Sequence, residues 1–242
     1  MNELLIKKIT EQVIAELKET HVAAEGQAKA TSNQQQPVFA SSVPNIPVGV
    51  SARHLHVCQE HLEILFGKGH KLTKLKDLPQ PGEYAAKESV TLIGQRLRAI
   101  EGVKILGDLR PVTQVEVSRT DARYLGIKPE IRRSGDTAGS PGITIVGPAG
   151  SLQLTEGVIV ANRHIHMNPN DAQRLGVSNN DEVDVRILST KPTILGKVQI
   201  RVSNNANLYM HIDVDDANAV AFDDNTFVEI LNMEESKCCW QG

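Results

Sequence analysis

The chain has 242 residues, of which 40% are hydrophobic and 23% are charged, and its formal net charge is −3. This composition is typical of a globular protein with one large domain or two small ones. Because the chain is not basic and only 3% of its residues are aromatic, a nucleic-acid partner is not expected, and no apolar run approaches the roughly 18 residues of a membrane-spanning helix.

The first 18 residues predict a short amphipathic helix, since apolar residues recur at every fourth position: Leu5, Ile9, Val13 and Leu17. Residues 19–44 are rich in Ala, Ser, Gln and Asn, and a segment of this composition is expected to be a flexible linker because it cannot bury enough apolar surface. Two interpretations of the helix are open. It docks on the chain's own body or on a twin subunit of a homo-oligomer, or it is an address peptide that inserts its apolar stripe into another protein.

From about residue 45 the chain reads as short strands separated by Gly, Pro, Asn and Asp. Several of these segments alternate apolar and polar residues, as half-buried strands do, and the clearest cover residues 90–94, 114–118, 143–147, 184–188 and 197–202. Short helices are predicted over 59–67, 120–127 and 170–177. The last two share Asp-Ala-x-x-Leu-Gly, in which the Asp is expected to cap the start of the helix and the Gly to end it.

One phrase occurs twice in this body. Residues 48–57 read V-G-V-S-A-R-H-L-H-V and residues 158–167 read V-I-V-A-N-R-H-I-H-M, so an apolar run leads into Arg-His-x-His in each copy. A short helical stretch follows both copies. This repetition of strand, loop and helix predicts two related β-barrel units, with the repeated loops lying where the units meet.

The His-x-His part of each phrase predicts half of a metal site. On a strand, residues i and i+2 point to the same face roughly 6.5–7 Å apart, so two imidazoles can share one ion, whereas on a helix they would lie about 200° apart. The two pairs are His54 with His56 and His164 with His166. Two copies that share a preceding arginine favour metal binding over isolated surface or core histidines.

Each pair needs a third ligand if the site is catalytic, because three protein ligands leave one coordination position open. His211 lies in a strand of alternating apolar and polar residues. It is either a metal ligand or a histidine buried in the core, and the sequence favours neither. Glu116 also lies in a strand-like run, and spacing alone favours a solvent-facing position. Cys58 is not assigned to a metal. The chain has 3 cysteines, and because an odd number argues against a disulfide framework, a reducing, cytosolic compartment is expected.

The arginines indicate what such metals would hold. Arg110 lies in a loop just before the strand of Glu116, and a guanidinium beside one or two zinc ions makes a strong site for phosphate or a carboxylate. Arg53 and Arg163 are expected to point to the strand face opposite the histidines and to pair with carboxylates. Three other arginines are expected to be solvated surface charges: Arg119, Arg132 and Arg133. No P-loop, Rossmann or Gly-x-Ser-x-Gly motif is present.

Together these residues resemble the PduL-type phosphate propanoyltransferases, which are phosphotransacylases. The motifs that carry the resemblance are the two repeated phrases, Q-V-E-V-S-R-T-D-A at 114–122 and M-H-I-D at 210–213, and they occur in the family's order between about residues 45 and 232. The resemblance implies a mainly β fold with two barrels and short helices. Residues 45–53 and 162–232 would form one discontinuous barrel and residues 54–161 the other, with 233–242 as a tail.

The resemblance also implies a site with two zinc ions between the barrels. One ion would be held by His54, His56 and Glu116, the other by His164, His166 and His211, and Arg110 would contact phosphate and act in catalysis. The implied reaction converts acyl-CoA and phosphate reversibly into acyl phosphate and CoA, with propanoyl taken from the family's name. Since no Ser or Cys nucleophile with a base partner is evident, phosphate is expected to attack the thioester directly.

Family members encoded with bacterial microcompartments carry a short helix on a linker. The resemblance therefore implies that residues 1–18 bring this chain into the microcompartment lumen by binding shell proteins or core enzymes, in the setting of propanediol degradation. Two other functions stay open at this stage. One is a zinc hydrolase, in which a metal activates water, and the other is a binding module whose metals only stabilise the fold.

Overall fold

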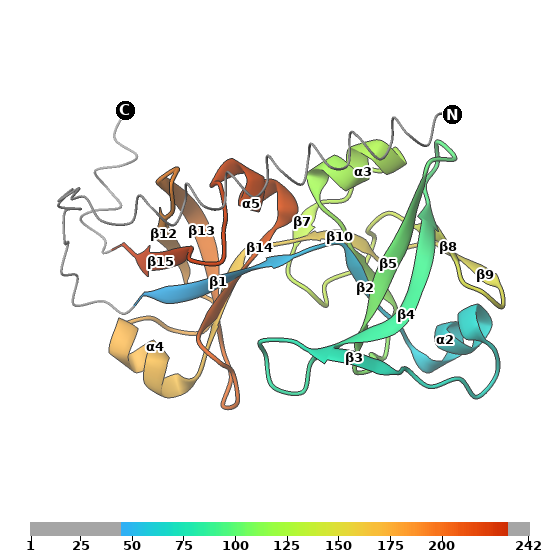
Figure 1. Cartoon of the computed structure of the whole chain (residues 1–242), viewed down its shortest axis with the longest axis horizontal. Helices are drawn as coiled ribbons and strands as arrows, with labels where there is room; N and C mark the ends of the chain where they lie inside the picture. Colours follow the sequence, from blue (N-terminus) through green and yellow to red (C-terminus); the bar gives the residue numbers. More distant parts are fainter. Residues whose placement is uncertain (1–44, 232–242) are drawn as a thin grey trace, which may run out of the picture. The chain divides into compact units, whose positions relative to one another are not determined.

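The computed structural model describes residues 45–231 (Figure 1). The predicted helix at 1–18, the linker at 19–44 and the tail at 233–242 lie outside the described residues. The described part is mainly β, as predicted, and consists of a closed six-stranded barrel and a nine-stranded sheet. Within this part, no helix is long and apolar enough to cross a membrane.

The barrel combines the first described strand with five strands from the last third of the chain. Its order is β1 (Ile46–Ser51), β14 (Tyr209–Asp213), β11 (His164–Met167), β13 (Thr193–Val202), β12 (Glu182–Leu188) and β15 (Phe227–Ile230). β1 closes the barrel by pairing parallel to β14 and antiparallel to β15. Alternate residues fill the interior with aliphatic side chains, among them Ile46, Ile165, Met167, Ile200 and Met210.

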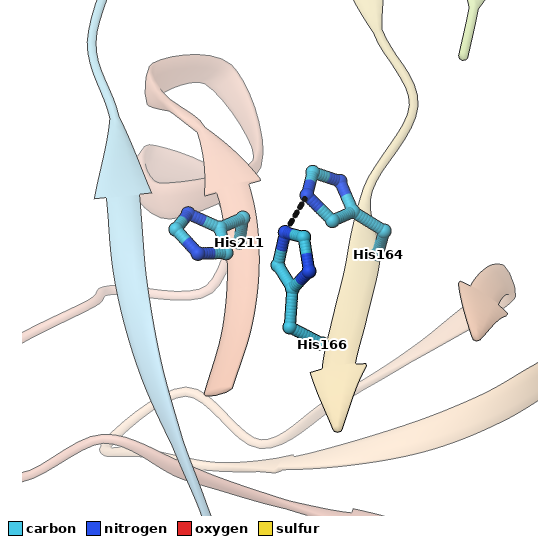
Figure 2. A group of neighbouring side chains, drawn as sticks. All are labelled: His164, His166 and His211. Atoms are coloured by element: carbon cyan, nitrogen blue, oxygen red, sulfur yellow. Dashed lines mark hydrogen bonds between the residues drawn. The ribbon is translucent and has the colours of Figure 1, made fainter. Parts of the chain in front are cut away.

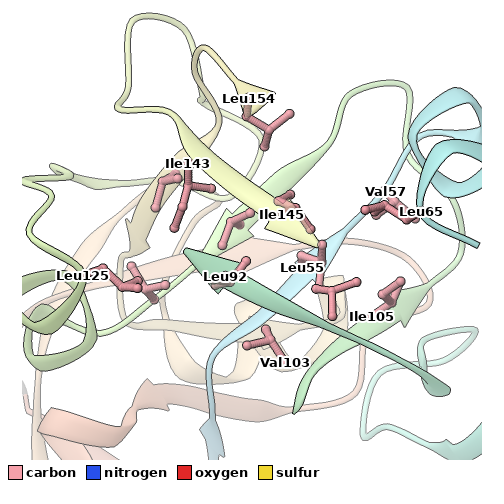
Figure 3. Close-up of a cluster of buried hydrophobic side chains, with 14 of the residues drawn as sticks. Leu55, Val57, Leu65, Leu92, Val103, Ile105, Leu125, Ile143, Ile145 and Leu154 are labelled. Atoms are coloured by element: carbon pink, nitrogen blue, oxygen red, sulfur yellow. The ribbon is translucent and has the colours of Figure 1, made fainter. Parts of the chain in front are cut away.

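The nine-stranded sheet comes from the middle of the chain and does not close. Its order is β7 (Ile131–Arg132), β10 (Val158–Ala161), β6 (Gln114–Glu116), β2 (His54–His56), β5 (Ala99–Gly107), β4 (Tyr84–Ile93), β8 (Ile143–Val146) and β9 (Ser151–Leu154), with β3 (Lys74–Asp77) paired to β4. One face carries a core that includes Leu55, Leu92, Val103, Ile105 and Ile145 (Figure 3). The other face of β2 and β6 is therefore left to polar side chains.

Four short helices lie between these strands: α2 (Gln59–Phe66), α3 (Arg119–Leu125), α4 (Pro169–Leu175) and α5 (Val214–Ala219). In α3 and α4 the predicted glycine stop is confirmed, because Gly126 and Gly176 are left-handed C-caps with φ of 77° and 67°. The predicted Asp N-caps are wrong. Ser118 and Asn168 hold that position, since their side-chain oxygens reach the backbone N–H of the Asp three residues later.

The repeated phrase is the place where the chain crosses between the two sheets. In the first copy β1 pairs with β14 of the barrel, but β2 pairs with β5 and β6 of the open sheet. In the second copy β10 pairs with β6 and β7, but β11 pairs with β13 and β14. Each His-x-His therefore begins where the chain has just changed sheets, and the two crossings line one cavity, as the repeat predicts.

The sheet register also shows which helices correspond. α3 follows β6, the strand opposite the first His-x-His, and α5 follows β14, the strand opposite the second. α2 and α4 instead follow the His-x-His strands themselves. The shared Asp-Ala-x-x-Leu-Gly motif of α3 and α4 thus reflects similar capping and does not mark equivalent positions in the two units.

Candidate metal centre

Three histidines from two adjacent barrel strands converge on one point. His164 and His166 lie on β11, and His211 lies on β14 directly opposite His164. The Nε2 atoms of His164 and His166 are 3.1 Å apart, and one ring nitrogen from each of the three residues lies within 4.8 Å of the others. Figure 2 shows the three imidazoles gathered between the two strands. Three neutral nitrogens at this spacing can hold one metal ion.

A second group of three lies on the open sheet in the same register. His54 on β2 is opposite Glu116 on β6, as His164 is opposite His211, and His56 completes the group. His54 Nε2 is 3.4 Å from Glu116 Oε2. Glu116 is only 8% exposed, so the expectation from spacing that it faces solvent is wrong. Its face of β6 is covered at the junction, where Ser134 donates to its carboxylate at 2.7 Å.

Backbone carbonyls fix the tautomer of the first histidine in each group. His54 Nδ1 lies 2.8 Å from the Ala52 carbonyl oxygen, and His164 Nδ1 lies 2.8 Å from the Asn162 carbonyl oxygen. A carbonyl oxygen only accepts, so Nδ1 carries the proton in both rings. In the neutral ring the lone pair is then on Nε2, as in histidines that bind metals through this atom.

Two further buried ring nitrogens have no hydrogen-bond partner in the described part of the chain, namely His56 Nδ1 and His211 Nε2. A buried polar atom without a partner is unfavourable. A metal ion bound in each group would give the nitrogen of that group a partner. One group offers two imidazoles and a carboxylate, the other three imidazoles. Both donor sets fit a divalent ion of the zinc type with one coordination position open.

Three of the candidate ligands are held in the neutral form that metal binding requires. Burial lowers the pKa of His56 to about 2, and the charge of Arg110 acts in the same direction. Burial also lowers the pKa of His166 to about 4 and that of His211 to about 3. All three rings therefore carry no charge at neutral pH.

One cavity is lined by members of both groups. It is lined by Glu116 from the open sheet and by His164 and His211 from the barrel, together with the two crossing segments. Ser51 Oγ lies 3.2 Å from His211 Nδ1, so the end of β1 orients this ring. The two groups thus face one shared space at the junction of the sheets.

Arg53 and Arg163 pair with carboxylates, as predicted. Arg53 donates to both oxygens of Asp121 at 2.9 and 2.8 Å, and Arg163 lies 3.3 Å from one oxygen of Asp216. The two arginines nevertheless line the same cavity as the histidines. The strand-face expectation fails because both residues lie in the irregular crossings, outside the strands.

Asp121 and Asp216 are equivalent in that each pairs with the arginine of one crossing. Replacing them tests how much each ion pair contributes to the free energy of unfolding. Asp121 is 5% exposed, closes the capping box of α3 and holds Arg53 by two bonds, whereas Asp216 is partly exposed and makes one longer contact. Asp121→Ala is expected to lower the free energy of unfolding by about 2–3 kcal/mol. Asp216→Ala should cost about 1 kcal/mol or less. Urea unfolding measures both, and equal losses would contradict the assignment.

Arg110 is connected to Glu116 through one serine. Its guanidinium donates to Ser134 Oγ at 3.0 Å, and Ser134 donates to Glu116, which also accepts from Gln114 at 2.6 Å. The backbone N–H of Arg110 donates to the Val57 carbonyl at 3.0 Å and so fixes the loop beside β2. Arg110 therefore lies at the first group of ligands, as expected from the sequence.

The comparisons with known proteins agree with this geometry. A family model described as phosphate propanoyltransferase matches residues 47–223, which include the three candidate ligands of each group and Arg110. The chain belongs to this family. The resemblance of the sequence motifs is thereby confirmed, and so is the expectation of an enzyme of the transferase type.

Individual members of the phosphate propanoyltransferase family are similar over most of their length. The protein of that name from Lachnoclostridium phytofermentans is 53% identical over 186 residues, which are 77% of this chain and 87% of the relative. Its counterpart from Thermotoga maritima is 50% identical over 78% of this chain and 90% of the relative. A third, from Alkaliphilus metalliredigens, is 43% identical over 93% of this chain and 97% of the relative.

Sequence reasoning missed several residues of this phosphate propanoyltransferase site. Ser134 and Gln114 bind Glu116, and Arg201 lies next to His166 on the neighbouring strand β13. Arg201 falls in a strand that the sequence predicts, but only the register between β11 and β13 reveals its neighbour. Among the arginines expected at the surface, Arg119 and Arg133 are exposed. Arg132 is 18% exposed and pairs with Glu130 and Asp136.

Proposed function

We propose that the protein catalyses the reversible reaction of an acyl-CoA with phosphate to give an acyl phosphate and CoA. Membership of the phosphate propanoyltransferase family supports the reaction class, and propanoyl is the acyl group we propose. The observation that carries the mechanism is the cavity shared by the two groups of ligands, with Arg110 beside one of them. Substrates that bind beside these groups would be held next to each other, which favours their reaction.

In this proposal each group of ligands holds one zinc ion. His54, His56 and Glu116 form one site, and His164, His166 and His211 form the other. Bound zinc would supply Lewis-acid polarisation of phosphate or carbonyl oxygens. The carbonyls of Ala52 and Asn162 keep the ligating nitrogens deprotonated, and the buried strands hold the ligand geometry.

Arg110 is proposed to bind and orient the phosphate that attacks the thioester. Ser134 accepts one of its N–H groups, so the other donors of the guanidinium can reach a substrate. A phosphate oxygen forms a bond to the acyl carbon, the carbon–sulfur bond breaks, and CoA leaves with the proton that phosphate gives up. No covalent acyl-enzyme is required, because orientation of the two substrates supplies the catalytic advantage.

The decisive assay follows CoA release from propanoyl-CoA by the zinc-loaded enzyme with and without phosphate. We expect release that depends on phosphate and yields propanoyl phosphate, detected as its hydroxamate, without free propanoate. Release without phosphate would support the zinc hydrolase instead. If no turnover occurs while both metals are bound, the chain is a metal-stabilised binding module.

Arg110→Ala should raise the KM for phosphate about 10- to 100-fold, since a charge-assisted hydrogen bond is worth about 1.5–3 kcal/mol. Metal content should stay the same, because Arg110 is not among the candidate ligands. Arg119→Ala, which removes an exposed arginine, serves as the control and should leave the KM for phosphate unchanged. If Arg110→Ala left the phosphate dependence intact, its assigned role would be wrong.

We also propose that residues 1–18 direct the enzyme into the lumen of a bacterial microcompartment by binding shell proteins or core enzymes. The amphipathic pattern of this segment supports the proposal. Deletion of the first 20 residues is expected to leave kcat/KM unchanged and to release the enzyme from purified compartments. Unaltered encapsulation would contradict it.

A further inference from the structure

Arg201 is placed beside the histidine group by the parallel pairing of β13 with β11, in which it lies next to His166. Its neighbour Ile200 points into the barrel core, so the Arg201 side chain lies on the outer face with the three histidines. That face is covered at the junction, and one terminal nitrogen of the Arg201 guanidinium is buried without a hydrogen-bond partner. The contact that its Nε makes to Gln199 Oε1, at 3.5 Å, is long for a hydrogen bond.

The charges around Arg201 come from both sheets. Burial lowers the pKa of Arg201 to about 10; the acidic Glu116 and Glu83 raise it, and the cationic Arg133 and Arg110 lower it. Arg201 is also the cation that acts on all three histidines of the barrel group. Its charge therefore acts on candidate ligands of both metal sites.

The corresponding position on the open sheet has no charge. β2 pairs parallel to β5 with His54 next to Lys104 and Leu55 next to Ile105, so Leu106 is the counterpart of Arg201 beside His56. The two copies of the repeated phrase thus each contribute to a group of metal ligands, but of the two strands paired parallel to them, β13 and β5, β13 alone carries an arginine at this position. A buried guanidinium nitrogen without a partner among the described residues, on an arginine whose charge interacts with that of a second arginine, is suited to binding an oxyanion.

We propose that Arg201 and Arg110, one from each sheet, together bind the phosphoryl group that enters or leaves the reaction. The ligand is the oxyanion of inorganic phosphate or of the acyl phosphate. This inference rests on the proposed function and adds a second phosphate-binding residue that no motif of the sequence indicates. Because the two arginines come from different sheets, the bound phosphoryl group would also tie the two sheets together.

Arg201→Met tests the proposal, because Met keeps the length of the side chain without its charge. In the zinc-loaded enzyme we expect the KM for phosphate to rise about 10- to 100-fold, as for loss of a charge-assisted hydrogen bond. The KM for propanoyl-CoA should change less than about twofold, and Arg201→Lys should recover part of the phosphate affinity because it restores the charge. Zinc content should equal that of the wild type.

A second readout does not use turnover. Inorganic phosphate should raise the Tm of the zinc-loaded wild type, and this rise should be lost in Arg201→Met. Without phosphate, the Tm of Arg201→Met should equal or exceed that of the wild type, because an apolar side chain replaces a buried guanidinium nitrogen that has no partner among the described residues. A merely structural arginine would instead give a lower Tm in both conditions. Arg119→Met, at the exposed surface, is the matched control.

Three outcomes would overturn the inference. The first is an unchanged KM for phosphate in Arg201→Met. The second is a raised KM for propanoyl-CoA alone, which would mean that Arg201 binds a phosphate of CoA. The third is a loss of zinc from the variant. A wild type that binds phosphate but never forms acyl phosphate would refute the proposed function. The shift of Tm with phosphate would still decide the role of Arg201 in that case.

Discussion

Replacing His211 by alanine is expected to remove one of the two zinc ions that we propose and to lower kcat/KM at least about 1,000-fold, since a metal contributes several kcal/mol to the stabilisation of a transition state. Within residues 45–231, His211 is one of three candidate ligands on the barrel, and its buried Nε2 has no hydrogen-bond partner there. Two histidines that remain on β11 cannot complete the site. Metal analysis of the purified variant and steady-state rates measure the two effects.

The second group of ligands provides the matched experiment. His56→Ala should remove the other zinc ion and leave the one held by the barrel, because the two groups belong to different sheets. His61→Ala, on α2 and bonded to Thr113 outside both groups, should retain two ions and full activity. Two zinc ions and an unchanged rate in His211→Ala would show that this group does not bind a metal needed for the reaction.

The local elements of this fold could be predicted from the sequence because their signals are local. Strand alternation predicts β4, β8, β12 and β13, and the Gly of Asp-Ala-x-x-Leu-Gly correctly ends α3 and α4. The same holds for the His-x-His pairs, since two side chains on one strand face depend on nothing beyond that strand.

The missed features all depend on pairing between distant segments. Glu116 is buried only because β6 lies beside β2 and β10 under the junction, which its own alternating pattern does not reveal. Arg201 reaches the site only through the register of β13 with β11. The predicted mainly β fold of two units is confirmed, as a closed barrel and a second sheet; the repeat does not reveal that the second sheet stops short of closing, because repeated phrases do not determine how many strands join each sheet.

Acid should destabilise the metal-free protein steeply between pH 6.5 and about 4. The folded-state pKa values of His56, His166 and His211 are about 2, 4 and 3, against 6.5 for an ordinary histidine. In this window the unfolded chain binds protons that the folded chain does not, so the free energy of unfolding rises with pH and is lost as pH falls. Each histidine contributes about 1.4 kcal/mol per pH unit, which sets an upper limit of about 4 kcal/mol per unit for the three.

Two carboxyl groups oppose this trend, because burial raises the pKa of Glu83 and of Asp216 and the folded state then takes up their protons first. They act above their ordinary values of 4.5 and 3.8, so the slope of the wild type combines both effects, and comparison with a histidine variant isolates the histidine contribution. Urea unfolding of the metal-free protein at pH 7.5, 6.5, 5.5 and 5.0 measures this slope. His56→Leu should reduce the slope by about one proton, or about 1.4 kcal/mol per pH unit.

The control is Val198→Ala, which opens a cavity in the barrel core and should lower the free energy of unfolding by a similar amount at every pH. A slope that His56→Leu leaves unchanged would mean that His56 is protonated in the folded metal-free chain. The expected slope follows from the same burial that prepares the site for metal. Rings kept neutral in the folded chain can bind an ion without first losing a proton, and the cost of keeping them neutral appears as acid sensitivity when the ion is removed.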